Sequence, residues 1–393
     1  MARILFVNIP AHGHVNPTFP LVLAFVKAGH KVDYLISESF RKKVEYCGAT
    51  FIPYLTPVDI DFTDRKFNIL RNIRKAFKEI DAGIRELGPQ YDVILLGGMH
   101  YDITKMAKEI KKPIIFCSAI FLMNEQTLNH LVKIAIGIPA LIRVVARNSI
   151  TRKLLSRFLL SPLLDLKIND LLTAIGPQSS TLNINFTSNY FHPEASTFDD
   201  KCLFIGPSPT ISLMDDTFPI SKLEDSKKKI IYATLGTAFN RWTGFFKSVI
   251  DAFKDSEYLV VMSTGNKETI KLIGDIPQNF IVRDFVPQAE VLKHADLFIA
   301  HGGMGSVSDG MYLGVPMILV PLGADQFFNA YRLQELGAGK VLKKHDVTAQ
   351  NLRREAKLVM ENDSFKAAVK KVQQSFISAG GPDLAVRKVE EML

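Results

Sequence analysis

Short apolar runs alternate along this chain with stretches in which apolar residues recur every three or four positions. The first such pair is the run Ile4 to Val7, followed by Leu21, Val22, Phe25 and Val26. An uninterrupted run of this length is typical of a strand covered on both faces, whereas the wider spacing is typical of a helix with one buried side. The first thirty residues are therefore predicted to form a strand, a loop and a helix.

The loop between these elements contains Ala11-His12-Gly13-His14-Val15, which fits neither period. Asn16 is predicted to cap the N-terminus of the following helix, with Pro17 at its first position, because these residue types are favoured there. Gly29 is predicted to end the helix, since glycine adopts the left-handed conformation without strain.

The alternation continues through the chain and predicts a parallel, doubly wound sheet in each half. Buried strands are predicted at residues 31–37, 93–96, 114–117, 230–234, 259–262, 297–300 and 317–320, and helices at 105–110 and 245–254. Residues 207–229 contain three prolines, two adjacent aspartates and three consecutive lysines, which is typical of an exposed linker. We therefore predict an N-terminal domain over residues 1–210 and a C-terminal domain over 211–393, with the cleft between them as the ligand site.

Length and composition agree with two globular domains. The chain has 393 residues, of which 47% are hydrophobic and 22% charged, so it is too long for one core and too apolar for a disordered protein. No apolar run reaches the roughly 18 residues of a membrane-spanning helix, and the N-terminal run is too short for a signal peptide. Cys47, Cys117 and Cys202 are far apart and odd in number, which excludes a disulfide framework and predicts a cytoplasmic protein.

The formal net charge of +8 does not indicate nucleic-acid binding, because 48 basic residues stand against 40 acidic ones and no basic run carries interleaved aromatics. Residues 131–160, however, hold six basic residues and no acidic one. This segment is either a helical flap whose apolar side packs on its own domain, or a basic amphipathic element in peripheral contact with a membrane or a lipophilic substrate.

The strongest chemical signal is a glycine-rich turn between a predicted strand and a predicted helix, His301-Gly302-Gly303-Met304-Gly305-Ser306. Such a turn lets backbone N–H groups close on an anion, and the helix dipole favours negative charge there. Ser306 adds a hydroxyl donor, and His301 can donate to a phosphate oxygen. Taken alone, the glycines are equally consistent with tight packing.

Residues around this turn have the chemistry to bind a base and sugars. Phe285 offers an aromatic face to a base, and Asp309 is an acceptor suited to a ribose diol. Asp325 and Gln326 follow the next predicted strand and offer hydrogen bonds to sugar hydroxyls. Thr237 adds a hydroxyl after the strand 230–234, at the carboxyl end of the sheet, where open α/β sheets bind ligands.

These motifs resemble those of the UDP-glycosyltransferase superfamily, in particular its bacterial macrolide glycosyltransferase branch. The resemblance covers nearly the whole chain and rests on Gly13-His14-Val15-Asn16-Pro17, Phe204-Ile205-Gly206-Pro207, the block from Phe285 to Gln326, and Gly380-Gly381. It implies a GT-B fold, with two facing Rossmann-like domains that hold the acceptor in the first and the nucleotide sugar mainly in the second. It also implies that the last helix packs back on the first domain.

The resemblance further implies roles in donor binding, from the base through the ribose and diphosphate to the hexose. Phe285 replaces the tryptophan on which many relatives stack uracil, and Asp309 stands where a glutamate usually binds the ribose. Asp325 and Gln326 match the pair that reads the hexose hydroxyls, which favours a glucose-type donor. The predicted donor-binding residues are Thr237, Phe285, Val286, Gln288, His301, Gly303, Met304, Gly305, Ser306, Asp309, Asp325 and Gln326.

By the same resemblance, His14 is the catalytic base, because a neutral imidazole can take the proton of an acceptor hydroxyl. In the family an aspartate after a buried strand orients this histidine, and the corresponding position here is Gly97. Three explanations stay open. Asp102 or His100 substitutes from a shifted loop, or the enzyme works without the partner, or it is slow or acts on an activated acceptor. His12, His30, His130 and His345 are expected to have structural roles.

The sequence thus predicts an inverting, metal-independent glycosyltransferase that moves a hexose, most simply glucose, from a UDP-sugar to a hydroxyl of a hydrophobic small molecule such as a macrolide, flavonoid or phenol. No cofactor or metal is expected, because His301, the hydroxyls and the helix N-terminus can stabilise the departing UDP. The pair Asp59 and Asp61 has the spacing of a metal-binding carboxylate pair but is expected to be solvated. Two alternatives stay open: transfer to a membrane lipid, and a UDP-sugar-binding protein with weakened catalysis. One set of residues is equally consistent with an acceptor pocket and with core: Phe51, Tyr54, Phe116, Phe121 and Leu122.

Overall fold

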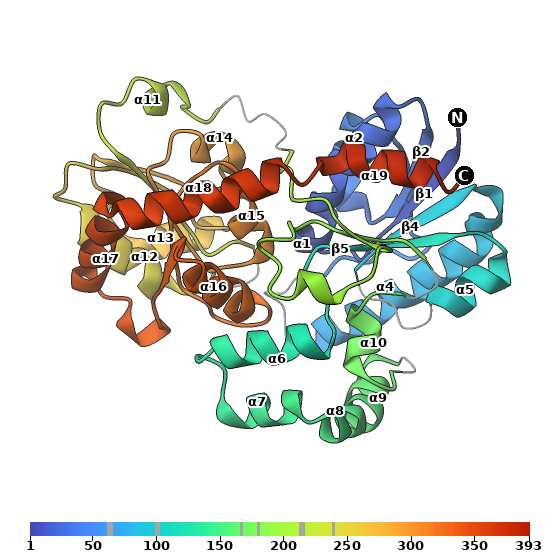
Figure 1. The fold of residues 1–393 in the computed structure, drawn as a ribbon. Coiled ribbons are helices and arrows are strands. Elements are labelled where there is room, and N and C mark those ends of the chain that lie inside the picture. Colours follow the sequence, from blue (N-terminus) through green and yellow to red (C-terminus); the bar gives the residue numbers. More distant parts are fainter. Residues whose placement is uncertain (61–65, 99–102, 166–167, 179–180, 212–216, 238–239) are drawn as a thin grey trace. The chain divides into compact units, whose positions relative to one another are not determined.

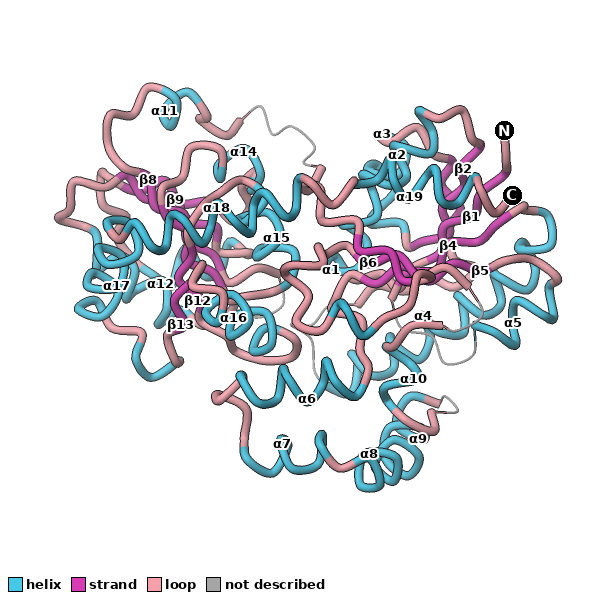
Figure 2. The backbone as a smooth tube through the Cα atoms, viewed as in Figure 1, coloured by secondary structure: helices cyan, strands magenta, loops and turns pink. Residues whose placement is uncertain are grey.

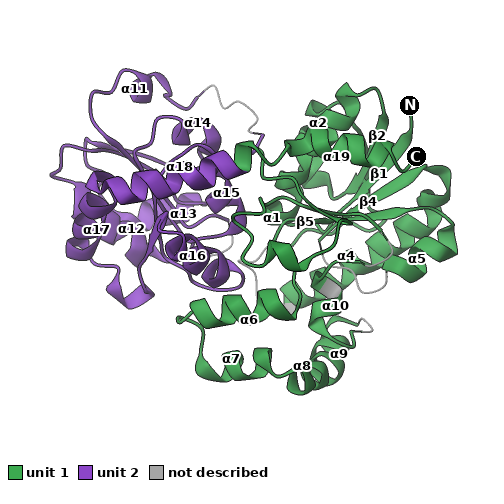
Figure 3. Cartoon of the chain, in the orientation of Figure 1, with its two compact units in different colours: residues 1–208, 376–393 green, residues 209–375 purple. Residues whose placement is uncertain are grey.

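The computed structural model describes residues 1–60, 66–98, 103–165, 168–178, 181–211, 217–237 and 240–393. The chain divides into two compact units, each with its own sheet (Figure 3). Unit 1 comprises Met1–Ser208 together with Phe376–Leu393, and unit 2 comprises Pro209–Ser375.

In unit 1, the described residues form a seven-stranded parallel sheet in the order β3-β2-β1-β4-β5-β6-β7 (Figure 1). The strands are β1 (Arg3–Val7), β2 (Lys31–Ile36), β3 (Thr50–Pro53), β4 (Val93–Gly97), β5 (Ile114–Ser118), β6 (Asn183–Asn185) and β7 (Cys202–Phe204). The helices are α1 (His12–Val15), α2 (Phe19–Lys27), α3 (Arg41–Tyr46), α4 (Lys66–Leu87), α5 (Ile103–Ile110), α6 (Glu125–Ile134), α7 (Ala140–Arg147), α8 (Ser149–Leu155), α9 (Ser161–Leu164), α10 (Leu171–Ile175) and α19 (Gly381–Glu390). Strand β1 pairs with both β2 and β4, so the sheet grows outward in two directions from its first strand.

In unit 2, the described residues form a six-stranded parallel sheet in the order β10-β9-β8-β11-β12-β13. The strands are β8 (Ile230–Thr234), β9 (Leu259–Ser263), β10 (Phe280–Arg283), β11 (Leu297–Ala300), β12 (Met317–Leu319) and β13 (Gly339–Val341). The helices are α11 (Ser221–Glu224), α12 (Thr243–Phe253), α13 (Lys267–Ile273), α14 (Gln288–Leu292), α15 (Met304–Tyr312), α16 (Gln326–Glu335), α17 (Ala349–Glu361) and α18 (Asp363–Ile377). Figure 2 shows helices flanking the strands of this sheet, as the apolar runs predicted for strands covered on both faces.

The last helix, α19, belongs to unit 1 and packs against α2. Val386 and Val389 are buried, and Glu390 Oε1 lies 2.9 Å from His30 Nε2, just beyond the C-terminal end of α2. The backbone N–H of Gly381 donates to the carbonyl of Ile205 at 2.8 Å. The N-terminal unit is therefore built from both ends of the described chain.

The N-terminal loop differs from the sequence prediction. Helix α1 continues through a 3₁₀ turn at Asn16–Thr18 directly into α2, and Asn16 itself is helical with φ −55° and ψ −42°. The side chain of Asn16 accepts a hydrogen bond from Lys43 Nζ at 3.1 Å, so a distant partner replaces the local cap. The prediction that Asn16 caps this helix is wrong, whereas Gly29 follows α2 with φ of 85°, as predicted.

Residues 207–229 are less exposed than an ordinary linker. Phe218 and Leu223 are buried, and Thr210 hydrogen-bonds to Asp309. The three lysines at 227–229 are exposed, as predicted. Only part of this segment therefore behaves as a solvated connection.

Candidate active site

In both units the strand order reverses between two neighbouring strands, β1 and β4 in unit 1 and β8 and β11 in unit 2. Open α/β sheets bind ligands at the carboxyl ends of such strands. His14 follows β1 and Gly97 ends β4, while Thr237 and His301 follow β8 and β11. Within each unit, the sheet thus brings together predicted residues that are distant in sequence.

His14 lies on the single turn α1, and its side chain is partly buried. Its Nδ1 atom is buried and has no hydrogen-bond partner among the described residues. Burial lowers the pKa of His14 to about 4, because the imidazolium would lose its hydration. The ring is therefore neutral at pH 7, which is the form that accepts a proton.

The space beside Gly97 is occupied by Asn8, which directly follows β1. A Cβ atom added at Gly97 would lie 2.4 Å from Asn8 Nδ2 and 2.8 Å from Asn8 Oδ1. Asn8 is fully buried, and its Nδ2 donates to the backbone carbonyl of His14 at 3.0 Å. Its Oδ1, like His14 Nδ1, is buried without a partner among the described residues. An amide from the neighbouring strand therefore fills the place where the resemblance expects a carboxylate.

The other two candidates for that role, His100 and Asp102, lie outside the described residues. Elsewhere in unit 1 the histidines have local partners. His30 pairs with Glu390, His130 Nδ1 lies 2.7 Å from Glu194 Oε1, and the His12 ring packs against Phe40 with centroids 4.9 Å apart. In unit 2, His345 Nε2 lies 3.5 Å from Asp346 Oδ1. These contacts agree with the structural roles expected for the four histidines.

The residues offered either as an acceptor pocket or as core are all buried inside unit 1: Phe51, Tyr54, Phe116, Phe121 and Leu122. Tyr54 donates its hydroxyl to the backbone carbonyl of Asn8, and Phe121 packs on Phe191 with centroids 5.4 Å apart. These contacts favour core packing for the set. They also tie Tyr54 to the strand end that holds Asn8.

In unit 2, His301 lies between two glycine-containing turns. A Cβ atom at Gly236 would lie 2.5 Å from its ring, and one at Gly303 would lie 2.7 Å from it. The ring is buried, its Nδ1 has no partner among the described residues, and burial lowers its pKa to about 4. Both turns therefore need glycine so that the backbone can close around the imidazole.

Helix α15 begins directly after this turn, and its N-cap residue, Gly303, supplies no side-chain cap. Its first N–H group, that of Met304, donates to the carboxylate of Asp325. A Cβ at Gly305 would meet no atom within 4 Å, so the space beside that residue is open. Ser306 is buried on the same turn. The N–H groups after Met304 and the open space fit a negatively charged group, as the sequence predicted for a diphosphate.

The predicted base and ribose residues take two different environments. Phe285 is 58% exposed and thus presents a free aromatic face, while Val286 is partly buried. Asp309 is 1% exposed and accepts hydrogen bonds from Gln288 Nε2 at 2.7 Å and from Thr210 at 3.0 and 3.1 Å. Gln288 and Asp309 are thus brought together, and the shorter aspartate is engaged by protein donors.

The predicted hexose residues are linked to the His301 turn. Burial raises the pKa of Asp325, while hydrogen bonds from Asn329 and from the backbone N–H of Met304 oppose that rise. Gln326 is buried, and its Oε1 accepts from the backbone N–H groups of Leu322 and Gly323 at 2.8 and 3.2 Å. Asp325 thus lies beside the first residue of α15. Gln326 holds the loop that leads into α16, through its bonds to Leu322 and Gly323.

Comparison with known proteins identifies the family. A family profile described as "Erythromycin biosynthesis protein CIII-like, C-terminal domain" matches residues 247–392. The "Uncharacterized UDP-glucosyltransferase YdhE" of Bacillus subtilis (strain 168) is 32% identical over 406 residues, with 100% of this chain and 99% of that protein covered. The "NDP-glycosyltransferase YjiC" of the same organism is 31% identical over 407 residues, with 100% and 97% covered. The crystal structure of CalG4, the calicheamicin glycosyltransferase, matches with a TM-score of 0.73 at 25% identity, with 100% and 98% covered.

The chain belongs to the UDP-glycosyltransferase superfamily. The resemblance drawn from the motifs is confirmed, and with it the GT-B fold built from two parallel-sheet α/β domains. The protein is a glycosyltransferase enzyme of the macrolide and natural-product type.

Sequence reasoning missed one residue in unit 2 of this glycosyltransferase. Asn329 is fully buried, and its Nδ2 donates to the carbonyl of Gly302 at 3.1 Å and to Asp325 Oδ2 at 2.8 Å. It therefore ties the glycine turn to the aspartate expected to read the hexose. Its position four residues after Asp325 on α16 was the available signal, because side chains four apart lie on one helix face.

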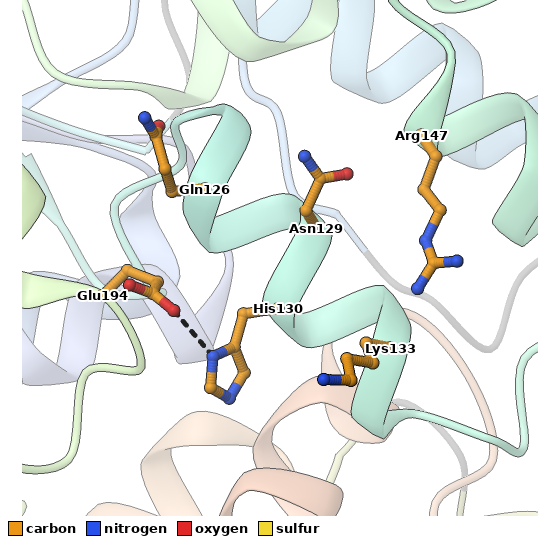
Figure 4. A pocket seen from close by; sticks show the side chains of 6 residues that line it. All are labelled: Gln126, Asn129, His130, Lys133, Arg147 and Glu194. Carbon is orange, nitrogen blue, oxygen red and sulfur yellow. Dashed lines mark hydrogen bonds and ion pairs between the residues drawn. The ribbon is translucent and has the colours of Figure 1, made fainter.

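The glycosyltransferase also has a cavity of about 540 Å³ in unit 1 that is open to solvent and lined by the polar residues Gln126, Asn129, His130, Lys133, Arg147 and Glu194 (Figure 4). The His130–Glu194 contact crosses it, and two further cations, Lys133 and Arg147, come from α6 and α7. No group of three or more metal-ligand side chains occurs among the described residues. Asp59 accepts a hydrogen bond from Ser39 Oγ, and Asp61 lies outside the described residues.

Proposed function

We propose that unit 2 binds a UDP-sugar, UDP-glucose first among them, and that His14 of unit 1 deprotonates a hydroxyl of a hydrophobic small-molecule acceptor. The observation that carries this proposal is the partly buried, neutral imidazole of His14 at the strand end where the sheet of unit 1 reverses its order. The relative named a UDP-glucosyltransferase supports the donor, and the one named an NDP-glycosyltransferase makes other nucleotide sugars the natural comparison.

The reaction follows from these groups in one displacement. His14 takes the acceptor proton as the hydroxyl oxygen forms its bond to the anomeric carbon. The bond from that carbon to the diphosphate breaks with its electron pair, so UDP departs and the anomeric configuration inverts. The N–H groups of α15 that follow Met304, with Ser306 and the hydroxyl of Thr237, stabilise the negative charge on the diphosphate without a metal ion.

In this mechanism we assign the orienting role to Asn8, which holds the backbone carbonyl of His14 through its Nδ2 but makes no hydrogen bond to the ring in this structure. A carboxylate would fix the imidazole tautomer and also stabilise the imidazolium, whereas an amide oxygen can do only the first. The pKa of His14 near 4 makes the base weak as well as neutral. We therefore expect the enzyme to prefer acceptors whose hydroxyl is already acidic, such as phenols, over aliphatic alcohols.

Ribose binding places a specific demand on Asp309. Its carboxylate already accepts hydrogen bonds from Gln288 and Thr210, so the ribose diol must replace at least one of them. The side chains of Gln288 and Thr210 can turn to a ribose oxygen instead, whereas the backbone N–H of Thr210 is fixed. Phe285, exposed and aromatic, stacks on the base in the same binding mode.

Two substitutions test the proposal by separating donor binding from proton transfer. His14→Ala should leave the calorimetric affinity for UDP unchanged and lower kcat by about 10²- to 10⁴-fold with UDP-glucose and a phenolic acceptor. Phe285→Ala should weaken UDP binding by about 5- to 150-fold, the effect of losing one base stack, while Phe285→Trp retains it.

Several results would contradict the proposal. Equal turnover in His14→Ala would remove His14 from the mechanism, and the absence of any UDP affinity in the native chain would overturn the donor assignment. A rate that falls to zero in EDTA and returns with a divalent cation would refute the metal-free displacement. A mass-spectrometric screen of nucleotide sugars against pooled acceptors then identifies the substrates.

Transfer to a membrane lipid is the second candidate. It is favoured by the exposed apolar and basic side chains of residues 136–159 in unit 1. Incubation with UDP-glucose and vesicles that contain hydroxylated lipids distinguishes the two acceptor classes, since only the second candidate yields a glycosylated lipid.

A further inference from the structure

Helices α7 and α8 of unit 1, with the π-helical turn Ser156–Leu160 that follows them, expose an unusual number of apolar side chains. Helix α7 buries none of its residues. Nine of the nineteen exposed large hydrophobic side chains in the described residues lie here or, in the case of Ile136, in the loop before α7: Ile136, Leu141, Ile142, Val144, Ile150, Leu154, Leu155, Phe158 and Leu159. We call these nine side chains, together with the basic residues between them, the flap face. Figure 1 shows α7 and α8 beyond α6, away from the sheet of unit 1.

The sequence along α8 explains why these side chains point outward. Arg152 and Ser156 are buried on one side of the helix, four residues apart. Ile150, Leu154 and Phe158 form a second row at the same spacing and are exposed, Phe158 to 70%. Lys153 and Arg157 form a third row beside the apolar one. The helix is thus amphipathic, with its apolar side turned to solvent.

The contacts that hold this segment to unit 1 are polar. The Arg152 guanidinium donates to Asp170 Oδ1 at 2.9 Å and also to Glu125, and only 5% of Arg152 is exposed. Ser156 Oγ accepts from the backbone N–H of Leu171 at 2.9 Å. Of the two interpretations of 131–160, packing of the apolar side on the domain therefore holds for the first part, where Leu131, Val132 and Ile138 are buried, but not for α8, where ionic and hydrogen-bonding groups occupy the inner side.

An exposed apolar face of this extent marks an interaction surface in a folded protein, and the charges around it indicate the partner. The chain from Gln126 to Leu164 contains six basic residues and no acidic one. Of these, Arg152 is paired inward, whereas Arg143, Arg147 and Arg157 take part in no ion pair among the described residues. The partner must therefore be apolar and negatively charged.

We propose that the flap face docks unit 1 on an anionic phospholipid bilayer. Ile150, Leu154 and Phe158 enter the boundary between headgroups and acyl chains, while Lys153 and Arg157 contact lipid phosphates. On α7 the same division recurs, with Leu141 and Val144 on one side and Arg143 and Arg147 on the other. Side chains of both kinds on short helices fit an interfacial contact, not a spanning one, and no described helix is long and apolar enough to cross a bilayer.

The cavity in Figure 4 brings further positive charge next to the flap face. Lys133 and Arg147 line it from α6 and α7, and Arg147 also belongs to the flap face. Glu194, its single carboxylate, is already paired with His130. The cavity thus leaves two cations free to attract phosphate groups beside α7. This proposal does not depend on the proposed donor or acceptor.

Co-sedimentation of the full chain with vesicles tests the proposal, with no nucleotide present. Vesicles of phosphatidylcholine with about 30% phosphatidylglycerol should bind the protein, and pure phosphatidylcholine should bind it far more weakly. The triple variant Arg143→Gln/Arg147→Gln/Arg157→Gln should lower the partition coefficient on the order of a hundredfold, since each cation near an anionic surface contributes about one log unit or slightly less. Phe158→Ser should lower it as well, by removing buried apolar area.

Matched controls come from unit 2. Lys227→Gln/Lys228→Gln/Lys229→Gln removes the same charge from an exposed site, and Leu272→Ser removes an apolar side chain that is 56% exposed. Both should sediment like the native chain, and far-UV circular dichroism confirms that every variant is folded. Absence of binding to the anionic vesicles, or equal losses in the control variants, would overturn the proposal. So would self-association in lipid-free solution that Phe158→Ser abolishes, because the face would then belong to a second copy of the chain.

Discussion

A methyl group at Gly97 tests whether Asn8 occupies the position of the family aspartate. In Gly97→Ala the new Cβ would lie 2.4 Å from Asn8 Nδ2 and 2.6 Å from Cγ, closer than carbon and nitrogen atoms pack. Asn8 must then move, and it cannot do so without losing its 3.0 Å hydrogen bond to the His14 carbonyl. Overpacking of this kind costs about 1–3 kcal/mol, and the hydrogen bond contributes about 1 kcal/mol. We expect Gly97→Ala to lower the free energy of unfolding by about 2–4 kcal/mol.

The assay is a double-mutant cycle with Asn8→Ala, followed by urea unfolding and by kcat/KM for one phenolic acceptor. Removing the amide makes room for the methyl group. The double variant should therefore lose at least about 1 kcal/mol less free energy of unfolding than the sum of the losses in the two single variants. Gly13→Ala is the matched control for stability, because a Cβ there meets no atom within 4 Å.

The catalytic arm of the experiment uses Asn8→Ala/Gly97→Asp, which moves the hydrogen-bonding group from β1 to the end of β4. This variant should recover kcat/KM lost in Asn8→Ala, since a carboxylate can both orient His14 and stabilise its charged form. Additive effects within about 0.5 kcal/mol, or a Gly97→Ala protein as stable as the native one, would refute the steric reasoning. Recovery of stability without activity would separate packing from orientation and remove Asn8 from the mechanism.

Other perturbations follow from buried charges. Because burial holds the pKa of His14 near 4, kcat/KM should stay constant from about pH 8 to about pH 6 and fall only towards pH 4. A pH profile of kcat/KM with its midpoint near 6.5 would instead show that the base is an exposed histidine. Burial also lowers the pKa of His301 to about 4. Between about pH 6.5 and pH 4, the unfolded chain therefore binds more protons than the folded one. As the pH is lowered through this range, the free energy of unfolding should decrease by up to about 3 kcal/mol. Urea unfolding of the native chain and His301→Gln at both ends of this range measures that contribution, which must shrink in the variant. Arg152→Ala leaves the carboxylate of Asp170 without its partner, so it should lower the free energy of unfolding by about 3 kcal/mol or open α8 locally, while Lys153→Ala should do neither. Hydrogen exchange across residues 149–164 measures this difference. Equal protection in both variants would contradict the prediction.

The sequence was a good guide wherever one strand or one turn decides the structure. The run from Ile230 to Thr234 became β8 with the predicted bounds, because a short apolar run is typical of a strand that helices cover on both faces. The glycines after His301 were singled out because their turn can close on an anion, and one of them, Gly303, lies against the His301 ring. These signals are local, so they can be read from neighbouring positions.

Contacts between distant residues decided the remaining features. Asn16 has a side chain that could cap a helix, but its Oδ1 accepts a hydrogen bond from Lys43 instead. Hydrophobic spacing showed that α8 has an apolar side, yet only the ion pairs of Arg152 with Asp170 and Glu125 determine that this side faces outward. The replacement for the family aspartate was equally hidden, because Asn8 and Gly97 meet only through the pairing of β1 with β4.

The return of α19 to unit 1 affects the order in which the protein matures on the ribosome. The strands of the first sheet emerge early, but the helix that covers α2 is translated only after all of unit 2. Until then the partner surface of Val386 and Val389 stays uncovered, so nascent chains halted before residue 381 should be more sensitive to protease and to chaperone capture than released ones. Unit 2, whose sequence is continuous, can complete its own sheet before unit 1 is finished.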